Sequence, residues 1–370
     1  VIDIRVLAFE AWPNLLNHKL GTIAKSLNLV DDVTLEQQAH GSMFDCQLSL
    51  QVYARLPPKW IADLDTCLAF QARAAALQAS DWEKYGVDAV VCGTDKLVEA
   101  EALGVELDYL PYAQPTLVEH LIKEKDDIER IPALDPGKGR IPSVAKEIAL
   151  VKQRFDNELV VAVVIGGPLT AADLLRGPTE LLMDMEEDPE YVHRLLRLTT
   201  DAIKRYVEVV AGAGAHAINM LDPFASSDVI SPAQYREFAF PYHKEVMEHI
   251  KGTGAVPLIH ICTYTQPIWE DMANTGAFGI HGDFEPDMAL AKQAVGGRIA
   301  LFGNVCPFKS LINGTPEDVI AESEHLIKTV GRDGGFVLAP GCDLDYNVPD
   351  ANIKAMVETA KRFTYPLEVD

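Results

Sequence analysis

The chain has 370 residues, of which 48% are hydrophobic and 24% charged, a composition that excludes a disordered or fibrous protein. Acidic residues outnumber basic ones by 55 to 32, and the net charge of −23 makes nucleic acid and anionic membranes poor partners. The longest mostly apolar stretch, 159–169, is interrupted by Gly166, Gly167 and Pro168 and is about half as long as a membrane-spanning helix.

The first part of the chain shows helical patterns on both sides of a turn at Leu56, Pro57 and Pro58. We expect residues 1–80 to form a helical cap on the domain that follows, residues 81–370. No secretory signal pattern follows the first residues, and no Cys-x-x-Cys pair is present, so we predict a cytoplasmic protein with free thiols. The six cysteines are Cys46, Cys67, Cys92, Cys262, Cys306 and Cys342.

From about residue 80 onward, short apolar runs alternate with polar loops and amphipathic helical segments. The runs are apolar on both faces, which is typical of parallel strands covered by helices. They span 87–92, 159–165, 216–221, 256–262, 278–282, 299–305 and 336–339. The helical segments between and after them include 188–211, 232–251, 265–275, 286–295, 315–330 and 349–363.

Two of these segments carry clear helix start signals, a proline in the first turn of SPAQYREF and a capping Thr315 in TPEDV. Seven strand–helix units in succession predict an α/β fold, a closed (β/α)₈ TIM barrel with an N-terminal helical extension. We expect the eighth strand near 46–52.

In such a barrel the catalytic residues lie at the carboxyl ends of the strands. We call this end of the barrel the mouth. His260 and Cys262 are two residues apart and therefore face the same side of one strand, and Cys342 ends another strand. Two sulfurs and one nitrogen suit zinc with one open coordination position. Each residue alone is more often part of a core, but all three at strand ends favour a metal site. Cys306 and His281 are either a fourth ligand or ordinary loop residues.

Other polar and aromatic residues also follow the strand ends. Asp222 and Asn304 have the character of groups that orient a substrate, although Asp222 precedes Pro223 and is equally suited to cap a turn. The aromatic residues that follow strand ends either form a docking rim or pack their own loops, and Tyr346 is also a candidate for substrate binding. They are Phe224, Tyr264, Phe284, Phe308 and Tyr346. The sequence contains no P-loop, dinucleotide-binding or nucleophile-elbow motif.

Ordered motifs over about 85–365 resemble the uroporphyrinogen decarboxylase superfamily. They include GTDKLVEAEALGVEL, GGPLTAADLLRG, LDPFASSDVISPAQYREFAFPYHKEV, LIHICTYTQPIWEDMANTGA, IALFGNVCPFKSLINGTPEDV and VLAPGCDLDYNVPDANIKAMVETAKRF. Within the superfamily they are similar to the zinc-containing, corrinoid-linked methyltransferases, whose mark is His-x-Cys followed far downstream by Cys. The resemblance implies catalytic zinc on His260, Cys262 and Cys342, and methylcobalamin on a separate corrinoid protein that docks at the mouth.

Three functions are consistent with the sequence. The first is methyl transfer from a corrinoid protein to a small thiol such as coenzyme M, activated as a thiolate on zinc. The second is demethylation of a small donor such as an aryl methyl ether, with transfer of the methyl group to Co(I). The third is metal-free decarboxylation of a tetrapyrrole, or non-catalytic corrinoid binding.

The sequence departs from the family pattern in two places. The first 80 residues do not resemble the usual family opening, and Cys306 stands where members typically have Asp. Both departures concern the identity of the substrate rather than the fold or the metal.

Overall fold

The computed structural model describes residues 83–93, 95–108, 115–155, 158–345 and 347–364. The cap predicted for residues 1–80, the eighth strand expected near 46–52 and Tyr346 lie outside the described residues. The division of the chain at residue 80 therefore stays a prediction.

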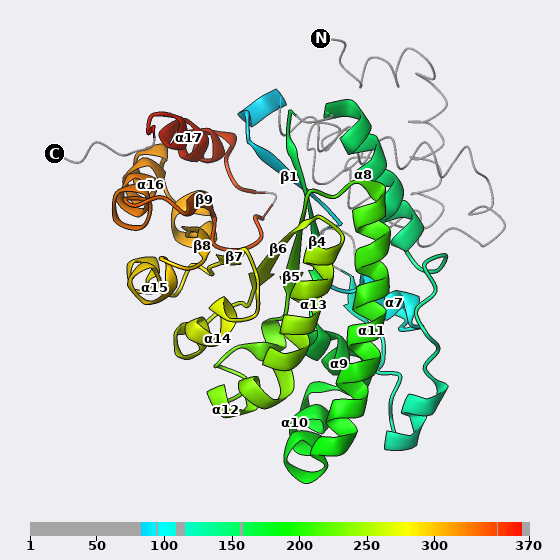
Figure 1. Ribbon diagram of the computed structural model, residues 1–370. Helices are drawn as coiled ribbons and strands as arrows, with labels where there is room; N and C mark the ends of the chain where they lie inside the picture. Colours follow the sequence, from blue (N-terminus) through cyan, green and yellow to red (C-terminus); the bar gives the residue numbers. More distant parts are fainter. Residues whose placement is uncertain (1–82, 94, 109–114, 156–157, 346, 365–370) are drawn as a thin grey trace, which may run out of the picture.

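Seven parallel strands form one curled sheet in the order β1-β4-β5-β6-β7-β8-β9, and this confirms the predicted TIM-barrel-like α/β fold (Figure 1). Each strand lies on one of the seven predicted apolar runs. In the part of the chain that the structure describes, β1 and β9 are the edges of the sheet. The strands are β1 (Ala89–Cys92), β4 (Val160–Gly166), β5 (Ala217–Leu221), β6 (Val256–His260), β7 (Gly279–His281), β8 (Ala300–Val305) and β9 (Phe336–Pro340). A separate antiparallel pair consists of β2 (Leu107–Asp108) and β3 (Thr116–Leu117).

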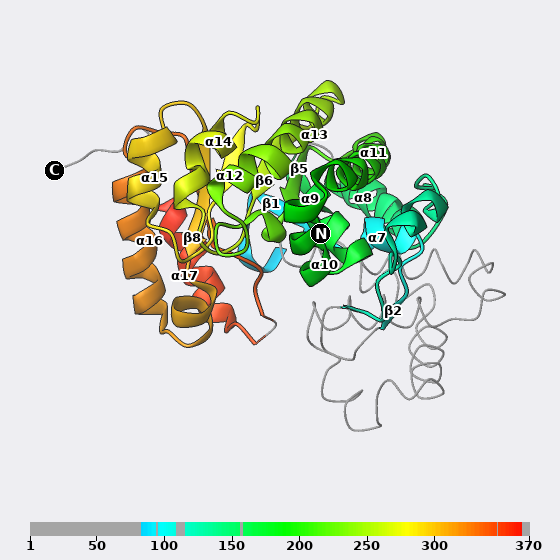
Figure 2. The ribbon, with the colours of Figure 1, turned by 90° about the horizontal axis from the view of Figure 1, so that it is seen from below.

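Helices follow the strands and form a layer outside the sheet, which Figure 2 shows from below. The α-helices are α7 (Val98–Ala102), α8 (Ile141–Phe155), α9 (Pro168–Arg176), α10 (Pro178–Glu187), α11 (Pro189–Ala213), α12 (Pro232–Gln234), α13 (Phe240–Gly252), α14 (Trp269–Ala273), α15 (Met288–Val295), α16 (Pro316–Val330) and α17 (Asp350–Lys361). Shorter 3₁₀ or π segments are η1 (Lys125–Arg130), η2 (Pro223–Ala225), η3 (Tyr235–Ala239), η4 (Gln266–Ile268) and η5 (Pro307–Ile312). The helix predicted over 232–251 is present but contains the π-helical segment η3. None of the described helices combines the length and apolar character needed to cross a membrane.

The predicted start of α16 is confirmed in atomic detail. The hydroxyl of Thr315 accepts a hydrogen bond from the backbone N–H of Asp318, and the Asp318 carboxylate accepts one from the N–H of Thr315 at 2.8 Å. This capping box satisfies two N–H groups that would otherwise lack partners. The helix therefore begins where the sequence places it.

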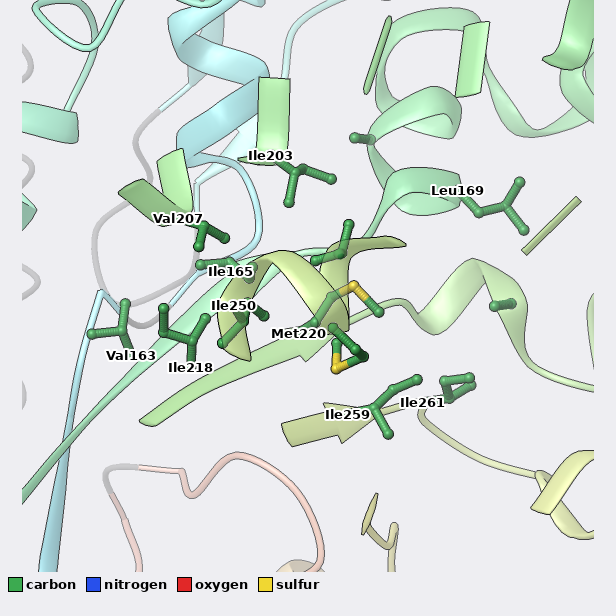
Figure 3. Close-up of a cluster of buried hydrophobic side chains, with 14 of the residues drawn as sticks. Val163, Ile165, Leu169, Ile203, Val207, Ile218, Met220, Ile250, Ile259 and Ile261 are labelled. Atoms are coloured by element: carbon green, nitrogen blue, oxygen red, sulfur yellow. The ribbon is translucent and has the colours of Figure 1, made fainter. Parts of the chain in front are cut away.

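The core lies between the strands and the outer helices (Figure 3). Ile165 of β4, Met220 of β5 and Ile259 of β6 are fully buried and belong to the same cluster as Ile203 of α11 and Ile250 of α13. Since side chains alternate along a strand, the residues on either side of these point toward the inside of the barrel. One such row, paired across neighbouring strands, is Gly166, Leu221, His260 and His281.

Candidate metal centre

Four side chains from three strand ends meet at the mouth of the barrel. His260 ends β6 and Cys262 follows it, Asp283 follows β7, and Cys342 follows β9. One ligand atom from each of these residues lies within 4.8 Å of every other. Ligand atoms about 2.0–2.3 Å from a shared zinc ion would lie roughly 3.3–3.8 Å apart in a tetrahedron, so a small contraction lets this set hold one ion. The three residues that the sequence predicts as ligands are thus brought together.

The imidazole of His260 is fixed in one tautomer. Its Nδ1–H donates a hydrogen bond to the carbonyl oxygen of His281 on the neighbouring strand, at 2.9 Å. The other ring nitrogen, Nε2, therefore carries the lone pair, and it lies 3.2 Å from the sulfur of Cys262. A carbonyl that binds the far nitrogen of a histidine is the usual way in which proteins orient a metal ligand.

The electrostatics of the cluster favour a bound cation. A hydrogen bond with Cys262 and one with His260 lower the pKa of Cys342, so this sulfur is the thiolate of the pair. The same contact with Cys342, together with burial, raises the pKa of Cys262. Burial acts to lower the pKa of His260, but the hydrogen bond and charge of Cys342 outweigh it and raise that pKa. A thiolate, a thiol, an imidazole and a carboxylate form the mixed sulfur, nitrogen and oxygen set that zinc prefers.

Asp283 is the fourth member of the cluster, and the sequence analysis did not single it out as a ligand. Its side chain is only 2% exposed, and its two oxygens accept hydrogen bonds from the N–H groups of Thr263 and Phe284, each at 2.6 Å. A signal for it does exist in the sequence. His260-x-Cys262 and His281-x-Asp283 have the same spacing, and His260 pairs with His281 in the sheet. Cys262 and Asp283 are therefore equivalent positions, each two residues beyond the end of one of two neighbouring strands.

The loop that carries Cys342 packs closely on the loop that carries Asp283. A Cβ atom on Gly341 would lie 2.6 Å from the backbone nitrogen of Phe284, closer than real Cβ atoms approach a backbone. Glycine is therefore needed at this position for the two loops to meet. The contact brings the sulfur of Cys342 to the carboxylate of Asp283.

The two residues considered as a fourth ligand lie outside the group of four. The Nε2–H of His281 donates to the carbonyl of Pro340 at 2.8 Å, which ties the end of β7 to the end of β9. Burial, with the charge of His260, lowers the pKa of His281 to about 4, so this ring is neutral at pH 7. The sulfur of Cys306 accepts a hydrogen bond from the N–H of Lys309 at the start of η5.

Asp222, one of the residues with the character of a substrate-orienting group, is fully buried. Its carboxylate accepts hydrogen bonds from the N–H of Leu169 and from both the N–H and the hydroxyl of Thr170. It also lies 2.8 Å from Nε2 of the buried His243. These bonds occupy both oxygens of Asp222 and anchor the start of α9. The sequence analysis offered a capping role for Asp222 as an alternative to substrate binding, but at the turn that follows Asp222 rather than at α9.

Asn304, the other candidate of that kind, supports the metal cluster from behind. Its side-chain N–H₂ donates to the carbonyl oxygens of Asp283 at 2.8 Å and Pro286 at 3.0 Å. The side chain is 5% exposed, and these two bonds hold the loop after β7 in place. Its predicted role in substrate binding stays a prediction.

The aromatic residues expected at a docking rim divide into two groups. Tyr264 and Phe308 are 44% and 56% exposed, and the ring of Phe284 packs edge-on against Phe308 with 5.7 Å between centroids. Phe224, by contrast, is buried in the core. The exposed rings lie on the loop after β6 and in η5 after β8, next to the cluster.

Comparisons with known proteins identify the family of the chain. Residues 64–363 match the family model described as uroporphyrinogen decarboxylase (URO-D). The chain is 30% identical over 281 residues to the methylcobamide:CoM methyltransferase MtbA of Methanosarcina acetivorans, covering 76% of this chain and 81% of that protein. It is 31% identical over 301 residues to a uroporphyrinogen decarboxylase of Chlorobium phaeovibrioides, covering 78% of this chain and 83% of that protein.

A solved structure has the same architecture. A methyltransferase from Methanosarcina mazei superposes with a TM-score of 0.74 at 26% sequence identity, over 79% of this chain and 85% of that one.

Proposed function

The chain belongs to the uroporphyrinogen decarboxylase family, in its corrinoid-dependent methyltransferase branch, and from this premise we propose a zinc-dependent reaction. It moves a methyl group between methylcobalamin on a corrinoid protein and a small substrate, with a thiol such as coenzyme M as the acceptor. Zinc is held by His260, Cys262 and Cys342 at the mouth, with Asp283 beside them.

The observation that carries this proposal is the meeting of two cysteine sulfurs and one histidine nitrogen at the mouth. The fold alone does not separate methyltransferases from decarboxylases, since this chain is similar to both. Two half-buried cysteines beside a buried imidazole are soft ligands, and a metal-free decarboxylation has no use for them. The cluster therefore favours the methyltransferase.

When zinc is bound at these residues with one position open, it lowers the pKa of a thiol that binds there and supplies a thiolate at neutral pH. The chain's own residues determine where that position lies. His260 presents Nε2 because the His281 carbonyl binds Nδ1. Asp283 is held by two backbone N–H groups, and Asn304 holds the backbone behind it. The substrate sulfur thus binds inside a preformed polar shell.

Two further parts of the proposal follow from this chemistry. The corrinoid must bring its cobalt-bound methyl group to the mouth, so we infer that the corrinoid protein docks over the loops after β5, β6, β8 and β9. Thiol ligands must stay reduced to bind zinc, and neither Cys262 nor Cys342 forms a disulfide in the structure. We therefore infer a reducing compartment such as the cytoplasm.

The test is methyl transfer by the zinc-loaded protein. We expect demethylation of free methylcobalamin when a small thiol is present, and loss of this activity after the metal is removed by a chelator. Methyl transfer from an aryl methyl ether to Co(I) cobalamin, without thiol methylation, would assign the opposite direction. Turnover that survives complete removal of the metal would contradict the proposal.

A further inference from the structure

Thr263, the residue directly after Cys262, has a backbone conformation that threonine rarely adopts. Its φ is 61°, in the left-handed region. A β-branched side chain crowds its own backbone in this region, which is why glycine normally occupies it. Among the residues that the structure describes, Thr263 is the one non-glycine residue with a positive φ. A strained residue persists only where its surroundings hold it, and such residues cluster at functional sites.

The unusual conformation bends the chain at the metal cluster. Up to Cys262 the side chains alternate: Nε2 of His260 and the sulfur of Cys262 lie 3.2 Å apart, and Ile261 between them belongs to the core (Figure 3). The chain then bends at Thr263, and the N–H of Thr263 donates a hydrogen bond to the carboxylate of Asp283 at 2.6 Å. The bend therefore follows one member of the cluster and directs a backbone N–H at another.

A hydrogen bond between two hydroxyl groups holds the side chain of Thr263. Its Oγ1 lies 2.7 Å from Oγ of Ser226, in the loop after β5. Ser226 is only 1% exposed, and its Oγ also accepts a hydrogen bond from the N–H of Asp228 at 3.2 Å. The hydroxyl of Ser226 is thus fixed in a buried position, and it ties Thr263 to the neighbouring loop.

The backbone beyond Thr263 is attached to the same loop. The N–H of Ser227 donates to the carbonyl oxygen of Tyr264 at 3.0 Å, and the N–H of Tyr264 donates to the carboxylate of Asp228 at 3.2 Å. The sheet holds the chain before the bend, and these two bonds hold it after the bend. The hydroxyl pair acts at the strained residue itself.

Glycine would adopt this conformation without strain, so the presence of threonine indicates that the hydroxyl bond compensates for the strain. Without that bond, a β-branched residue should relax toward negative φ. Such a relaxation would rotate the N–H of Thr263 away from Asp283. It would also move the backbone that carries the sulfur of Cys262.

We propose that Thr263 is a positioning residue of the metal centre. Its bond to Ser226 maintains the left-handed bend, and the bend places the sulfur of Cys262 and the carboxylate of Asp283 for zinc. This inference rests on the proposed function, since it takes zinc as the metal of the cluster. Thr263 acts through these two groups and does not itself contact the metal.

The experiment compares Thr263→Val, Thr263→Ser and Thr263→Gly with the wild-type protein. Zinc affinity is measured by competition with a chelator, and the absorption spectrum of the Co(II)-substituted protein reports on the sulfur ligands. Valine keeps the branched shape but lacks the hydroxyl, so Thr263→Val should bind zinc about tenfold more weakly and show weaker thiolate–Co(II) bands. Thr263→Ser keeps the hydroxyl and should retain the wild-type affinity and spectrum. Thr263→Gly lacks the hydroxyl but adopts the left-handed conformation freely, so it should also retain them.

Ser226→Ala removes the other half of the hydroxyl pair. It should weaken zinc binding in the wild-type background but have little further effect in Thr263→Gly, where no hydroxyl bond is left to lose. Thr253→Val is the matched control. The hydroxyl of Thr253 donates to the carbonyl oxygen of Ile250 at 2.7 Å, but its φ is −80° and it lies at the end of α13, away from the cluster. This variant should retain its zinc affinity.

Urea unfolding of the metal-free proteins shows whether each variant folds, and if Thr263→Val does not, Ser226→Ala in the two backgrounds decides the question. Equal loss of zinc affinity in Thr263→Gly and Thr263→Val would overturn the inference, because the hydroxyl rather than the conformation would then matter. An unchanged affinity and spectrum in Thr263→Val would overturn it as well, and if the wild type transfers methyl groups, the proposed function then stands without it. If the wild type binds zinc but transfers no methyl group, the proposed function fails, and the zinc affinities of the variants still decide the inference.

Discussion

A histidine binds a metal through a nitrogen that carries no proton, and in this protein one carbonyl decides which nitrogen that is. The carbonyl belongs to His281, so the strand beside β6 determines the tautomer of His260. The ring of His281 in turn binds the carbonyl of Pro340, two residues before Cys342. The ligands are therefore connected through the backbone of the sheet as well as through the cluster itself.

Removal of either sulfur should remove the metal. We expect about one zinc per chain in the wild-type protein and loss of most of it in Cys262→Ala and Cys342→Ala, because a three-ligand site cannot spare one ligand. Elemental analysis after purification without chelators measures this.

The control for this prediction is Cys306→Ala. Its thiol is also half-buried and follows a strand, but it bonds to the N–H of Lys309 instead of joining the cluster. The zinc content of this variant should equal that of the wild type. Zinc retained in Cys342→Ala, or lost in Cys306→Ala, would show that the ligand assignment is wrong.

Glu99 is a second residue whose environment controls its chemistry. It is 1% exposed, one oxygen accepts the N–H of Gly166, and the other, Oε2, has no hydrogen-bond partner among the described residues. Burial raises the pKa of Glu99 to about 8. The carboxyl is therefore protonated at neutral pH in the folded protein, whereas it is ionised in the unfolded chain.

This difference makes stability depend on pH. Between about pH 4.5 and pH 8 the folded state keeps a proton that the unfolded state has released, so a rise in pH across this range lowers the free energy of unfolding. The Glu99→Gln variant keeps a side-chain oxygen that accepts the hydrogen bond from the N–H of Gly166, but it removes the carboxyl group that titrates. Relative to wild type, the variant should gain roughly 1 kcal/mol per pH unit from pH 5 to pH 8. Urea unfolding at several pH values measures this, and parallel curves for the two proteins would contradict it.

At the scale of elements, the strands were predictable because their sequences are apolar on both faces and separated by regular helical patterns. The ends of α11, α15 and α16 also agree closely with the predicted segments. Other elements do not show such a pattern. Helix α9 is buried on several sides, including at Leu169, Ala172 and Leu175, so it lacks the polar face by which an amphipathic helix is recognised.

The candidate metal cluster was predictable in part for a similar reason. The period of two along β6 places His260 and Cys262 together, and the barrel topology adds Cys342. The role of Asp283 depends on how the loop after β7 turns, which backbone N–H groups and the close contact at Gly341 determine. Local sequence does not encode a contact between loops almost sixty residues apart. The N-terminal cap and the eighth strand stay predictions.

The contact between these loops gives a prediction of its own. In Gly341→Ala the new Cβ would meet the backbone of Phe284, so the loop that carries Cys342 must shift. We expect zinc affinity to fall about tenfold and the protein to lose about 1–3 kcal/mol of stability. Competition with a zinc chelator and urea unfolding measure the two effects.

Gly212→Ala is the control, because nothing lies within 4 Å of a Cβ atom at that position in α11. This variant should keep its zinc affinity and gain a few tenths of a kcal/mol or more from improved helix propensity. An unchanged zinc affinity in Gly341→Ala would mean that the two loops do not position the ligands.

For the whole molecule, the described residues carry exposed aromatic rings at both ends of the barrel. Tyr264 and Phe308 lie at the mouth, whereas Phe278, 58% exposed, precedes β7 and lies at the opposite end. The chain carries a net charge of −23. An apolar rim on such a protein gives a partner protein a contact that does not depend on the sign of the partner's charge. We expect the corrinoid protein to use the rim at the mouth.

A charge placed on this rim should separate the two methyl donors. Tyr264→Glu should lower turnover with a corrinoid protein at least tenfold more than turnover with free methylcobalamin, because only the protein donor needs the rim. Phe278→Glu changes a more exposed ring at the other end of the barrel and should affect neither assay. Steady-state rates with both donors measure this. Equal losses in Tyr264→Glu would place this ring in the pocket for the small substrate.

The spacing of the ligands along the chain also has a consequence for biosynthesis. His260 and Cys262 are synthesised together, but Cys342 follows eighty residues later, and it reaches them only when β7, β8 and β9 have paired in turn. A chain that ends before Cys342 lacks one of the two sulfurs of the proposed site, and we expect it not to retain zinc. Stable metal binding, as proposed above, therefore has to wait until the last strand of the described sheet has paired.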